Sequence, residues 1–577
     1  MIKKLLSYVK EYKLVSFLTP LMMALEVLME IIIPLVMAKI IDNGLQANDV
    51  SYVVRLGVLM IFLAGLSLIF GVLGGFFGAK ASAGLAKNLR QAVYEKIQTF
   101  SFFNIDKFQT SSLITRMTTD IVSIQQSYQM ILRMGIRAPL TMIIAFIMAH
   151  GISSDLSFIF IVAIPFVLAF IIIIMVRTMP KFKVMFEKYD VLNRTTQENL
   201  SAIRVVKSFV REDHEIDKFD KAVDDIYKTS VAAEKMFAIA NPVMTFMMYM
   251  IMMVICWFAS SKIVLGELST GNFMTLLTYS MTVLSSLLMV SMFFVMISMS
   301  FAAMKRVYEV LCEEVDLKNP VNPVYGVKDG SVEFEDVSFS YYKDKNKLHL
   351  ENINFKIPSG ITVGIIGGTG DGKSTLVSLI ARLYDATKGV VKVGGLNVKD
   401  YDIESLRKEV SMVLQKNVLF SGTIKDNLRW GDENATDEEI VRACKLACAD
   451  EFIESFPDKY DTYIEQGGSN VSGGQKQRLC IARALLSKPK ILILDDSTSA
   501  VDMKTDAIIR KAFREEIPDT TKIIIAQRIS SIEDADLIIV MSEGKIVAKG
   551  NHDELIKNCD IYKEIYDTQT RGGIIHE

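Results

Sequence analysis

The sequence predicts an α-helical membrane domain followed by a separate α/β domain. The first 305 residues contain six apolar stretches, and a helix needs about 20 apolar residues to cross a bilayer. The composition changes sharply near residue 305. Beyond it, the aliphatic run Ile491-Leu492-Ile493-Leu494 is typical of a strand buried on both faces of a parallel sheet.

Composition limits the classes of function. The chain has 577 residues, 50% of them hydrophobic, and a mean hydropathy of +0.31, which is high for a soluble protein. A formal net charge of −2 gives no case for nucleic acid as a partner. Six cysteines are scattered without paired spacing. Cys444 and Cys448 lie one helical turn apart without a nearby His, so they are interpreted as small packing residues in a reduced cytosol.

The six expected spans are 15–41, 52–79, 134–150, 155–178, 240–262 and 271–300. The first is too long for a signal peptide, so we expect a retained helix. The short connections 42–51 and 151–156 contain no Lys or Arg, whereas the long connections 80–133 and 179–239 are rich in both. This bias predicts a multi-pass protein of the inner cell membrane with both termini and both long connections in the cytoplasm.

Each long connection has helical spacing with few breakers. About 27 helical residues reach roughly 40 Å, so each connection is expected to form a hairpin, with turns near 108–112 and 210–214. The linker after the membrane domain (1–305) is 306–330, where Asn319-Pro320-Val321-Asn322-Pro323 breaks the helix. The α/β domain, 331–577, opens with an alternating strand pattern at 332–337.

Charged residues and methionines in the spans are candidates for the lining of a substrate cavity. Glu26 and Glu30 lie one turn apart in the first span, and charges within a span usually face a cavity or a partner. A charged pair beside a water-filled vestibule, without a role in substrate binding, is the alternative. Methionines crowd the last two spans, and Met248 and Met292 are expected at the cavity, with ordinary helix packing as the alternative for such residues.

Two motifs carry the chemistry of the α/β domain. The run 367–374 is Gly-Gly-Thr-Gly-Asp-Gly-Lys-Ser, which matches a P-loop between a strand and a helix. Its lysine is expected at the β- and γ-phosphates and its serine at Mg²⁺. In the second motif, Asp495 and Asp496 end a strand, where ligands of parallel sheets lie. The phosphate-binding residues expected are Gly367, Gly370, Gly372, Lys373, Ser374 and Thr375.

These motifs resemble those of ATP-binding cassette (ABC) proteins over residues 330–577. The run 471–475 resembles the LSGGQ signature, and 491–496 resembles the Walker B strand. Segments near 103–120 and 198–209 resemble the two coupling regions of ABC exporters. The chain therefore resembles a half-size, multidrug-type ABC exporter. The fold class implied is a six-span transmembrane domain of exporter type fused to an α/β P-loop nucleotide-binding domain with a helical subdomain.

The resemblance implies roles for single residues. Tyr341 matches the aromatic residue that stacks on adenine, with Tyr342 as the alternative, and Gln415 matches the Q-loop glutamine. The run Ser499-Ala500-Val501-Asp502 matches the D-loop, which makes Asp502 its acidic residue. ATP and Mg²⁺ are the implied cofactors. The implied Mg²⁺ residues are Ser374, Gln415 and Asp495, and the implied signature residues, acting on a second chain's ATP, are Ser472, Gly473, Gly474 and Gln475.

Two positions depart from the family at the groups that hydrolyse ATP. Asp496 replaces the catalytic glutamate, and Gln527 replaces the switch histidine. Aspartate is shorter by about 1 Å, and misplacement of that size costs about 10²-fold in rate. Glutamine donates a hydrogen bond but cannot carry the charge of an imidazolium. Together these changes indicate a site that holds ATP rather than splitting it.

The economical interpretation is a degenerate-site subunit of a heterodimeric bacterial exporter. The partner half-transporter would carry the main hydrolytic groups, and this chain's signature would complete the partner's site. The expected function is ATP-driven efflux of small amphipathic or apolar compounds through the lipid bilayer. The alternatives are a homodimeric lipid or peptide exporter with slow hydrolysis, and an ATP-binding regulatory membrane subunit. An importer is disfavoured, because importers usually keep spans and cassette on separate chains.

Overall fold

The computed structural model describes residues 1–342, 347–497 and 501–574. The contacts divide the chain into two compact units. The first, the membrane unit, comprises Met1–Gln98 and Ser111–Glu313, and the second, the cassette unit, comprises Thr99–Thr110 and Glu314–Glu577. A short segment from within the first long connection therefore folds with the cassette.

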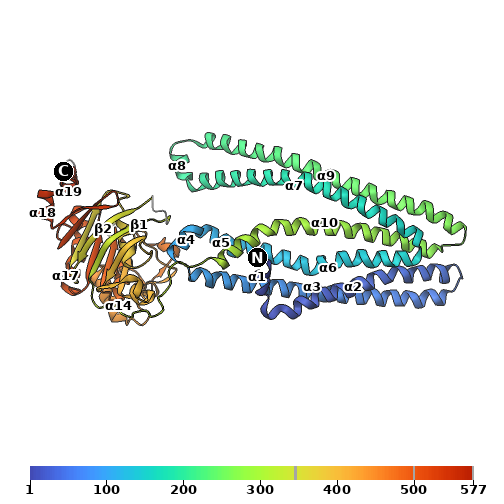
Figure 1. The fold of residues 1–577 in the computed structure, drawn as a ribbon, viewed down its shortest axis with the longest axis horizontal. Coiled ribbons are helices and arrows are strands. Elements are labelled where there is room, and N and C mark those ends of the chain that lie inside the picture. Colours follow the sequence, from blue (N-terminus) through green and yellow to red (C-terminus); the bar gives the residue numbers. More distant parts are fainter. Residues whose placement is uncertain (343–346, 498–500, 575–577) are drawn as a thin grey trace. The chain divides into compact units, whose positions relative to one another are not determined.

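The membrane unit is helical throughout its described part (Figure 1). Six of its helices are long and apolar enough to cross a bilayer, which confirms the predicted six spans. The spans lie within Lys10–Leu45, Val50–Gln98, Thr110–Ile152, Ser154–Ser201, Pro242–Val264 and Thr270–Val290. The helices are α1 (Ile2–Ser7), α2 (Lys13–Lys39), α3 (Val50–Gln98), α5 (Thr110–Thr115), α6 (Ile121–Ile152), α7 (Ser154–Ser201), α8 (Ile203–Ser208), α9 (Glu212–Val264) and α10 (Thr270–Cys312), with π-helical turns η2 (Ile40–Leu45) and η3 (Arg116–Asp120).

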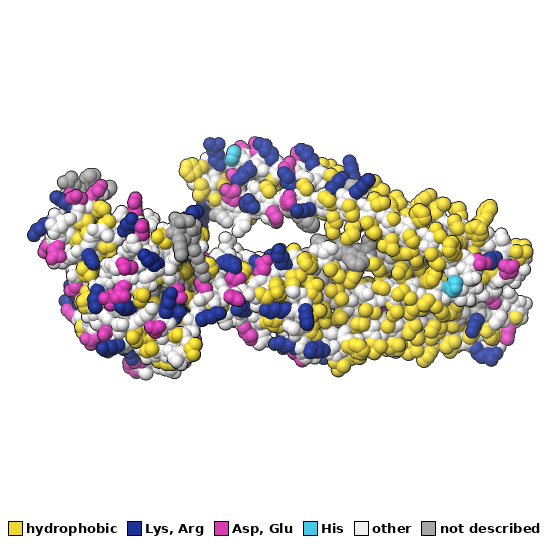
Figure 2. Space-filling view, in the orientation of Figure 1, with side chains coloured by type: hydrophobic (Ala, Val, Ile, Leu, Met, Phe, Trp, Pro, Cys, Tyr) yellow, Lys and Arg dark blue, Asp and Glu magenta, His cyan; other side chains and the backbone are white. Residues whose placement is uncertain are grey.

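Side-chain chemistry divides these helices along their length. Figure 2 shows hydrophobic side chains gathered over the middle of the long helices and charged side chains gathered near α8. The helices α7 and α9 pair as a hairpin whose tip is α8 (Figure 1). The chain reverses through left-handed residues at Gln109 (φ 56°) and Val210 (φ 52°), inside the two segments where turns were expected.

Small residues let α2 and α3 approach each other closely. A Cβ on Gly84 would lie 2.4 Å from Cγ and Cδ2 of the Tyr12 ring, just before α2. Earlier in α3, a Cβ on Gly71 would lie 2.9 Å from a carboxylate oxygen of Glu26 in α2. Close backbone approach at small residues is how helices associate in lipid, where the hydrophobic effect gives little drive.

The cassette unit is built on a six-stranded sheet in the order β12-β11-β3-β10-β9-β6. Its strands are parallel except for β12, and every residue of β9 and β10 is buried, as expected for a sheet covered on both faces. Alternate residues of β9 join different cores: Leu492 and Leu494 face one, Ile491 and Ile493 the other. The strands are β3 (Thr362–Gly367), β6 (Val410–Val413), β9 (Ile491–Asp495), β10 (Thr521–Ile525), β11 (Leu537–Ser542) and β12 (Lys545–Gly550).

A second, antiparallel sheet in the order β2-β1-β4-β5 and a two-stranded β7-β8 ribbon complete the β-structure of the described residues. The strands are β1 (Val332–Phe339), β2 (Leu350–Ile357), β4 (Lys388–Val393), β5 (Leu396–Asn397), β7 (Gly422–Thr423) and β8 (Tyr463–Ile464). The helices are α4 (Phe102–Phe108), α11 (Lys373–Ile380), α12 (Ile403–Glu409), α13 (Ile424–Leu428), α14 (Asp437–Leu446), α15 (Asp450–Glu454), α16 (Gly473–Leu486), α17 (Met503–Glu516), α18 (His552–Asn558) and α19 (Asp560–Ile574).

The helix α4 comes from the first long connection but folds with the cassette. The Tyr384 hydroxyl donates a hydrogen bond to Asp106 at 2.7 Å, and the Tyr384 ring lies 6.0 Å from that of Phe102. Burial and the nearby Asp106 raise the pKa of Tyr384, so it stays a hydrogen-bond donor. The segment that resembles a coupling region is therefore held by an aromatic and a polar contact together.

Candidate functional site

The P-loop joins β3 to α11. Gly370 (φ 94°) and Gly372 (φ 87°) are left-handed, a conformation that glycine adopts without strain. The Lys373 ammonium donates to the carbonyl oxygens of Gly367 at 2.9 Å and Gly368 at 2.6 Å. Burial lowers the pKa of Lys373. The loop thus surrounds a partly buried ammonium, which suits the predicted role of Lys373 at a phosphate.

The end of β9 faces the start of α11. The Ser374 hydroxyl donates to Asp495 Oδ1 at 2.9 Å. Burial raises the pKa of Asp495, against the hydrogen bond from Ser374. A hydroxyl and a carboxylate supply the oxygen ligands that Mg²⁺ prefers, so this pair fits the expected metal. These two residues, 121 positions apart in the chain, are brought together as the motifs predicted.

The two substituted positions are also brought together. Gln527 Nε2 donates to Asp496 Oδ2 at 2.7 Å, and Gln415 donates to the same carboxylate. Burial raises the pKa of Asp496, against these hydrogen bonds and the charge of Lys373. Asp496 is left-handed (φ 49°), a conformation that aspartate tolerates more readily than most residues.

The loop that carries Gln527 is fixed by a residue that the sequence did not single out. Gln569 of α19 donates from Nε2 to the Gln527 carbonyl at 2.8 Å and accepts from the Ile529 amide at 2.9 Å. A cavity of about 570 Å³ lies here, lined by Asp496, Gln527 and Gln569 among others. An exposed glutamine in a polar C-terminal helix carries no motif, so the pattern gave no indication of this contact.

The two candidate adenine-stacking residues have different surroundings. Tyr341 is half-buried, its hydroxyl lies 3.0 Å from Thr375 Oγ1, and its ring packs edge-on against Tyr384 at 5.1 Å. Tyr342 is 71% exposed and lies beside His349. Tyr341 therefore lies next to the P-loop helix, whereas Tyr342 is largely exposed to solvent.

The signature residues form a helix start. Ser472 caps α16: its hydroxyl accepts from the Gln475 amide at 3.3 Å, and the Gln475 side chain accepts from the Ser472 amide at 2.8 Å. Ser472 and Gly473 are exposed, and Gly474 is half-exposed at the first turn of α16. Asp502 caps α17 by accepting from the Thr505 amide at 2.9 Å. The D-loop residues 499 and 500 lie outside the described residues.

In the membrane unit, the predicted glutamates share one counter-ion. Arg137 of α6 contacts Glu26 at 2.9 Å and Glu30 at 2.7 Å. Glu26 is buried, whereas the Glu30 side chain is 40% exposed. Met248 is half-buried and packs against an apolar cluster of α7, α9 and α10. The side chain of Met292 lies outside the described residues.

Comparisons with known families and proteins agree along the whole chain. Residues 17–305 match the family described as ABC transporter transmembrane region, and residues 350–499 match the family described as ABC transporter. An uncharacterized ABC transporter ATP-binding protein of Bacillus subtilis, YfiB, is 36% identical over 567 residues, 98% of each chain. An uncharacterized ABC transporter ATP-binding protein of Mycobacterium tuberculosis is 34% identical over 577 residues, again 98% of each chain.

A solved structure shares the fold. It is described as a bacterial Atm1-family ABC exporter with ATP bound, and it superposes with a TM-score of 0.83. The match covers 97% of this chain and 98% of the other, at 23% identity. At that identity the likeness concerns the fold: six spans followed by a nucleotide-binding domain.

Proposed function

Because the chain belongs to the ABC transporter family and has the fold of an exporter, we propose that it is the degenerate-site half of a heterodimeric exporter. An ABC ATPase domain binds ATP, usually with Mg²⁺, and implies ATP hydrolysis. The proposed division of labour gives ATP retention to this chain and most of the hydrolysis to its partner. The observation that carries the proposal is the hydrogen bond between Gln527 and Asp496.

That contact joins the two substituted positions to each other. A general base must accept a proton from the attacking water. Asp496 instead accepts hydrogen bonds from Gln527 and Gln415, which compete with a water molecule for its carboxylate oxygens. Its side chain is also shorter than the family's glutamate by about 1 Å, which misplaces the carboxylate as a base, and the neutral Gln527 brings no charge to a γ-phosphate.

The contacts of the groups proposed to bind ATP support nucleotide binding by this chain. Lys373 lies within the P-loop, and Ser374 meets Asp495 at 2.9 Å. The signature residue Ser472 is exposed at the N-terminus of α16, where backbone N–H groups suit an anion. We propose that this chain binds Mg-ATP on its own P-loop and that Ser472 completes the partner's ATP site.

Exposed apolar residues at the tip of the α7–α9 hairpin are an argument for an assembly of two chains. Val205 is 56% exposed, Phe209 72% and Val210 81%, so an apolar patch lies bare beside the charged part of the hairpin. Exposed apolar patches rimmed by polar residues mark interaction sites. In the proposed dimer, with long connections and termini in the cytoplasm, this tip is buried by the second chain.

The proposed substrates are small amphipathic or apolar compounds. A cavity of about 600 Å³ opens between α7 and α9, and its walls are almost entirely aliphatic, aromatic or methionine side chains, including Phe166, Phe246 and Met250. Methionine-rich apolar surfaces adapt to ligands of different shapes. The Glu26–Arg137–Glu30 cluster is the proposed charged part of the pathway.

The test compares the chain alone with the chain co-expressed with a half-transporter that carries the Walker B glutamate and the switch histidine. Alone, the chain is expected to hydrolyse ATP weakly. In the heterodimer, Ser472→Ala is expected to depress ATPase activity strongly, because it damages the competent site. Asp496→Ala is expected to be much milder, because the site it damages contributes little turnover.

Ser469→Ala is the matched control for Ser472→Ala. Ser469 is exposed, lies three residues earlier, and bonds Glu465 rather than the start of α16. It should leave ATPase activity unchanged. Vigorous ATPase activity from the purified chain alone would support a homodimer instead. Loss of activity with Asp496→Ala but not with Ser472→Ala would reverse the assignment of the two sites.

A further inference from the structure

The chain passes between the membrane unit and the cassette unit at three points: Gln98/Thr99, Thr110/Ser111 and Glu313/Glu314. The second point lies at the start of α5, which leads into η3 and α6, and the third lies just after α10. Two of the three connections therefore begin in helices of the membrane unit that pack on each other along their length.

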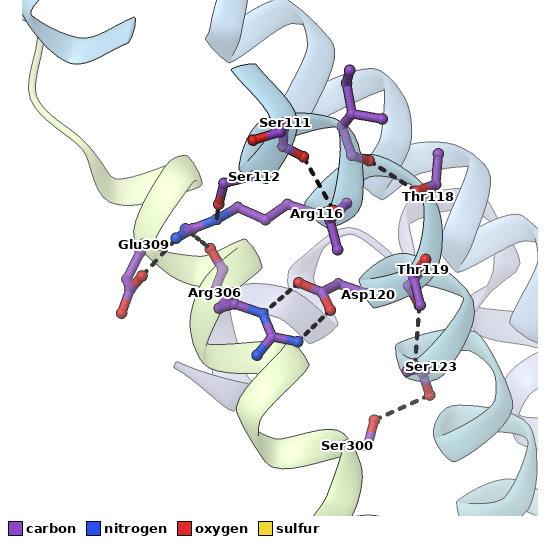
Figure 3. A network of polar contacts seen from close by, with 12 residues as sticks. Ser111, Ser112, Arg116, Thr118, Thr119, Asp120, Ser123, Ser300, Arg306 and Glu309 are labelled. Carbon is purple, nitrogen blue, oxygen red and sulfur yellow. Dashed lines mark hydrogen bonds and ion pairs between the residues drawn. The ribbon is translucent and has the colours of Figure 1, made fainter. Parts of the chain in front are cut away.

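On the membrane side, those two helices are tied by an ionic cluster in which Asp120 and Arg116 are buried and Arg306 and Glu309 are partly exposed (Figure 3). Arg306 of α10 bonds Asp120 of η3 twice, Nε to Oδ2 at 2.7 Å and Nη2 to Oδ1 at 2.5 Å. Arg116 donates from Nη1 to the Arg306 carbonyl at 2.6 Å and to Glu309 at 3.2 Å. We name Arg116, Asp120, Arg306 and Glu309 the crossing cluster.

The local backbone places these groups. Arg116 and Asp120 are four residues apart in η3, a π-helical turn between α5 and α6, and π-turns occur frequently at functional sites. Asp120 is 2% exposed and the Arg116 side chain 10%. A buried charge that loses its partner is strongly destabilised, so the geometry of the crossing cluster resists slippage of α10 against η3.

On the cassette side, the same two connections are tied a second time. Ser101, at the N-terminus of α4, donates to Asp316 at 2.5 Å. Asn104 donates from Nδ2 to the Glu314 carbonyl at 3.1 Å. The segment that leads into η3 and the segment that follows α10 are thus fastened to each other within each unit.

We propose that the crossing cluster is a positioning device of the transport cycle. By locking η3 to α10, it makes the two connections move together as one strut. The conformational change that ATP binding causes in the cassette is thereby transmitted to the spans. Asp120 and Arg306 are its central pair. The proposal requires ATP binding by the cassette and is independent of the heterodimer proposed above.

The chain supplies its own reporters. It has two tryptophans: Trp257 in α9 of the membrane unit and Trp430 in the cassette unit. Trp430→Phe leaves a membrane reporter, and Trp257→Phe leaves a cassette reporter. The full-length chain in lipid nanodiscs would be unfolded by heating with and without Mg-ATP, and tryptophan fluorescence would give the unfolding midpoint. At about 100 times Kd, ATP is expected to raise the midpoint seen by either reporter by about 5 to 10 °C.

With Arg306→Gln, ATP is expected to raise the unfolding midpoint reported by Trp430 as in the wild-type chain. The increase in the midpoint reported by Trp257 is expected to fall to less than half of the wild-type increase. Arg306→Lys, which retains the charge but not the two-pronged contact, is expected to restore part of it. Asp120→Asn with Arg306→Gln leaves no unpaired charge and guards against simple misfolding. The matched control is Asp225→Asn, which breaks a 2.7 Å ion pair to Lys188 between α7 and α9 and should preserve both rises.

Three outcomes would overturn the proposal. The crossing variants could lower both midpoints while leaving the ATP-dependent rises intact, which would show a purely structural role. They could abolish the rise at Trp430 as well, which would place the defect in the cassette. Finally, ATP could fail to raise the unfolding midpoint reported by Trp257 in the wild-type chain. The effect of ATP binding would then not pass from the cassette to the spans, and the crossing cluster would have no such role.

Discussion

At the scale of single residues, two polar contacts characterise the candidate nucleotide site: Ser374 with Asp495, and Gln527 with Asp496. The P-loop and the Walker B strand predicted that Ser374 and Asp495 lie together, because both positions belong to motifs with fixed strand and helix contexts. The substitutions at Asp496 and Gln527 were also visible in the sequence. Their direct contact at 2.7 Å was not, because side-chain pairing depends on how β9 and β10 end relative to each other.

Burial separates the reactivities of the cysteines. Cys444 is fully buried, and burial raises the pKa of its thiol to about 12. Because the thiolate is the nucleophile, only about one Cys444 in 10⁴ is reactive at pH 8. We expect N-ethylmaleimide to label the half-exposed Cys312, which ends α10 outside the spans, and to spare Cys444 in the folded protein. Mass spectrometry would test this.

In denaturant, all six cysteines should be labelled, which controls for detection. Because the pKa of Cys444 lies above the pH used, its slow labelling should accelerate about tenfold per pH unit while the fold persists. Rapid labelling of Cys444 at pH 8 in the folded protein would contradict the packing role.

At the scale of elements, the apolar spans were predictable because lipid selects composition directly. Hydropathy did not mark the ends of the helices that contain the spans. The third span was expected at 134–150, whereas the helix α6 begins at Ile121, within the connection that was itself expected to be helical. The helix continues through polar residues because α10 packs beside it, a tertiary contact that hydropathy does not record. For the same reason, the sequence did not show that α4 folds with the cassette.

The close approach of α3 to the N-terminal segment gives an element-scale prediction. Gly84→Ala would place a Cβ 2.4 Å from the base of the Tyr12 ring, which cannot move away as a flexible chain end would. We expect a loss of stability of about 1–3 kcal/mol, typical of overpacking, measured as a lower unfolding midpoint in detergent. Gly57→Ala in the same helix meets nothing within 4 Å and should leave the midpoint unchanged or raise it. Equal effects would contradict close packing at Gly84.

At the scale of the whole molecule, hydropathy predicted six spans, and the motifs of the α/β domain predicted the nucleotide-binding domain that follows them. The rarity of charges within apolar spans singled out the two acidic residues of the first span. The sequence did not show that Arg137 of α6 pairs with both, since pairing across helices depends on their rotation. The segment 103–120 was recognised as resembling a coupling region, but the contact of Asp120 with Arg306 was not predicted, because it depends on how η3 packs on α10.

The Glu26–Arg137–Glu30 cluster predicts charge selectivity. Replacing both glutamates with Gln leaves Arg137 unpaired and positive, so transport of cationic dyes should fall more than transport of neutral dyes. Adding Arg137→Gln removes the remaining charge and should restore part of the cationic transport. Dye efflux from inverted vesicles measures both. An equal loss for both dye classes would indicate helix packing as the role of the cluster.

The last prediction concerns how long nucleotide stays on this chain. Lys373, Ser374 and Asp495 are positioned to bind Mg-ATP, whereas Asp496 and Gln527 satisfy each other. We therefore expect nucleotide to remain on this chain's P-loop through several turnovers while the partner's P-loop empties in each. Retained nucleotide would hold the cassettes in partial contact, a coupling of about 1–3 kcal/mol.

Photolabelling of the heterodimer with 8-azido-ATP, followed by a chase with unlabelled ATP, measures retention on each chain. The label should outlast several turnovers on this chain alone. Asp496→Glu with Gln527→His restores the family's hydrolytic groups and should shorten retention here by about 10²-fold. Asp496→Glu alone should act less, because it keeps Gln527 and places a glutamate in a left-handed conformation. Equal retention on both chains would mean that the two sites turn over together, and the asymmetry inferred from Asp496 and Gln527 would fall.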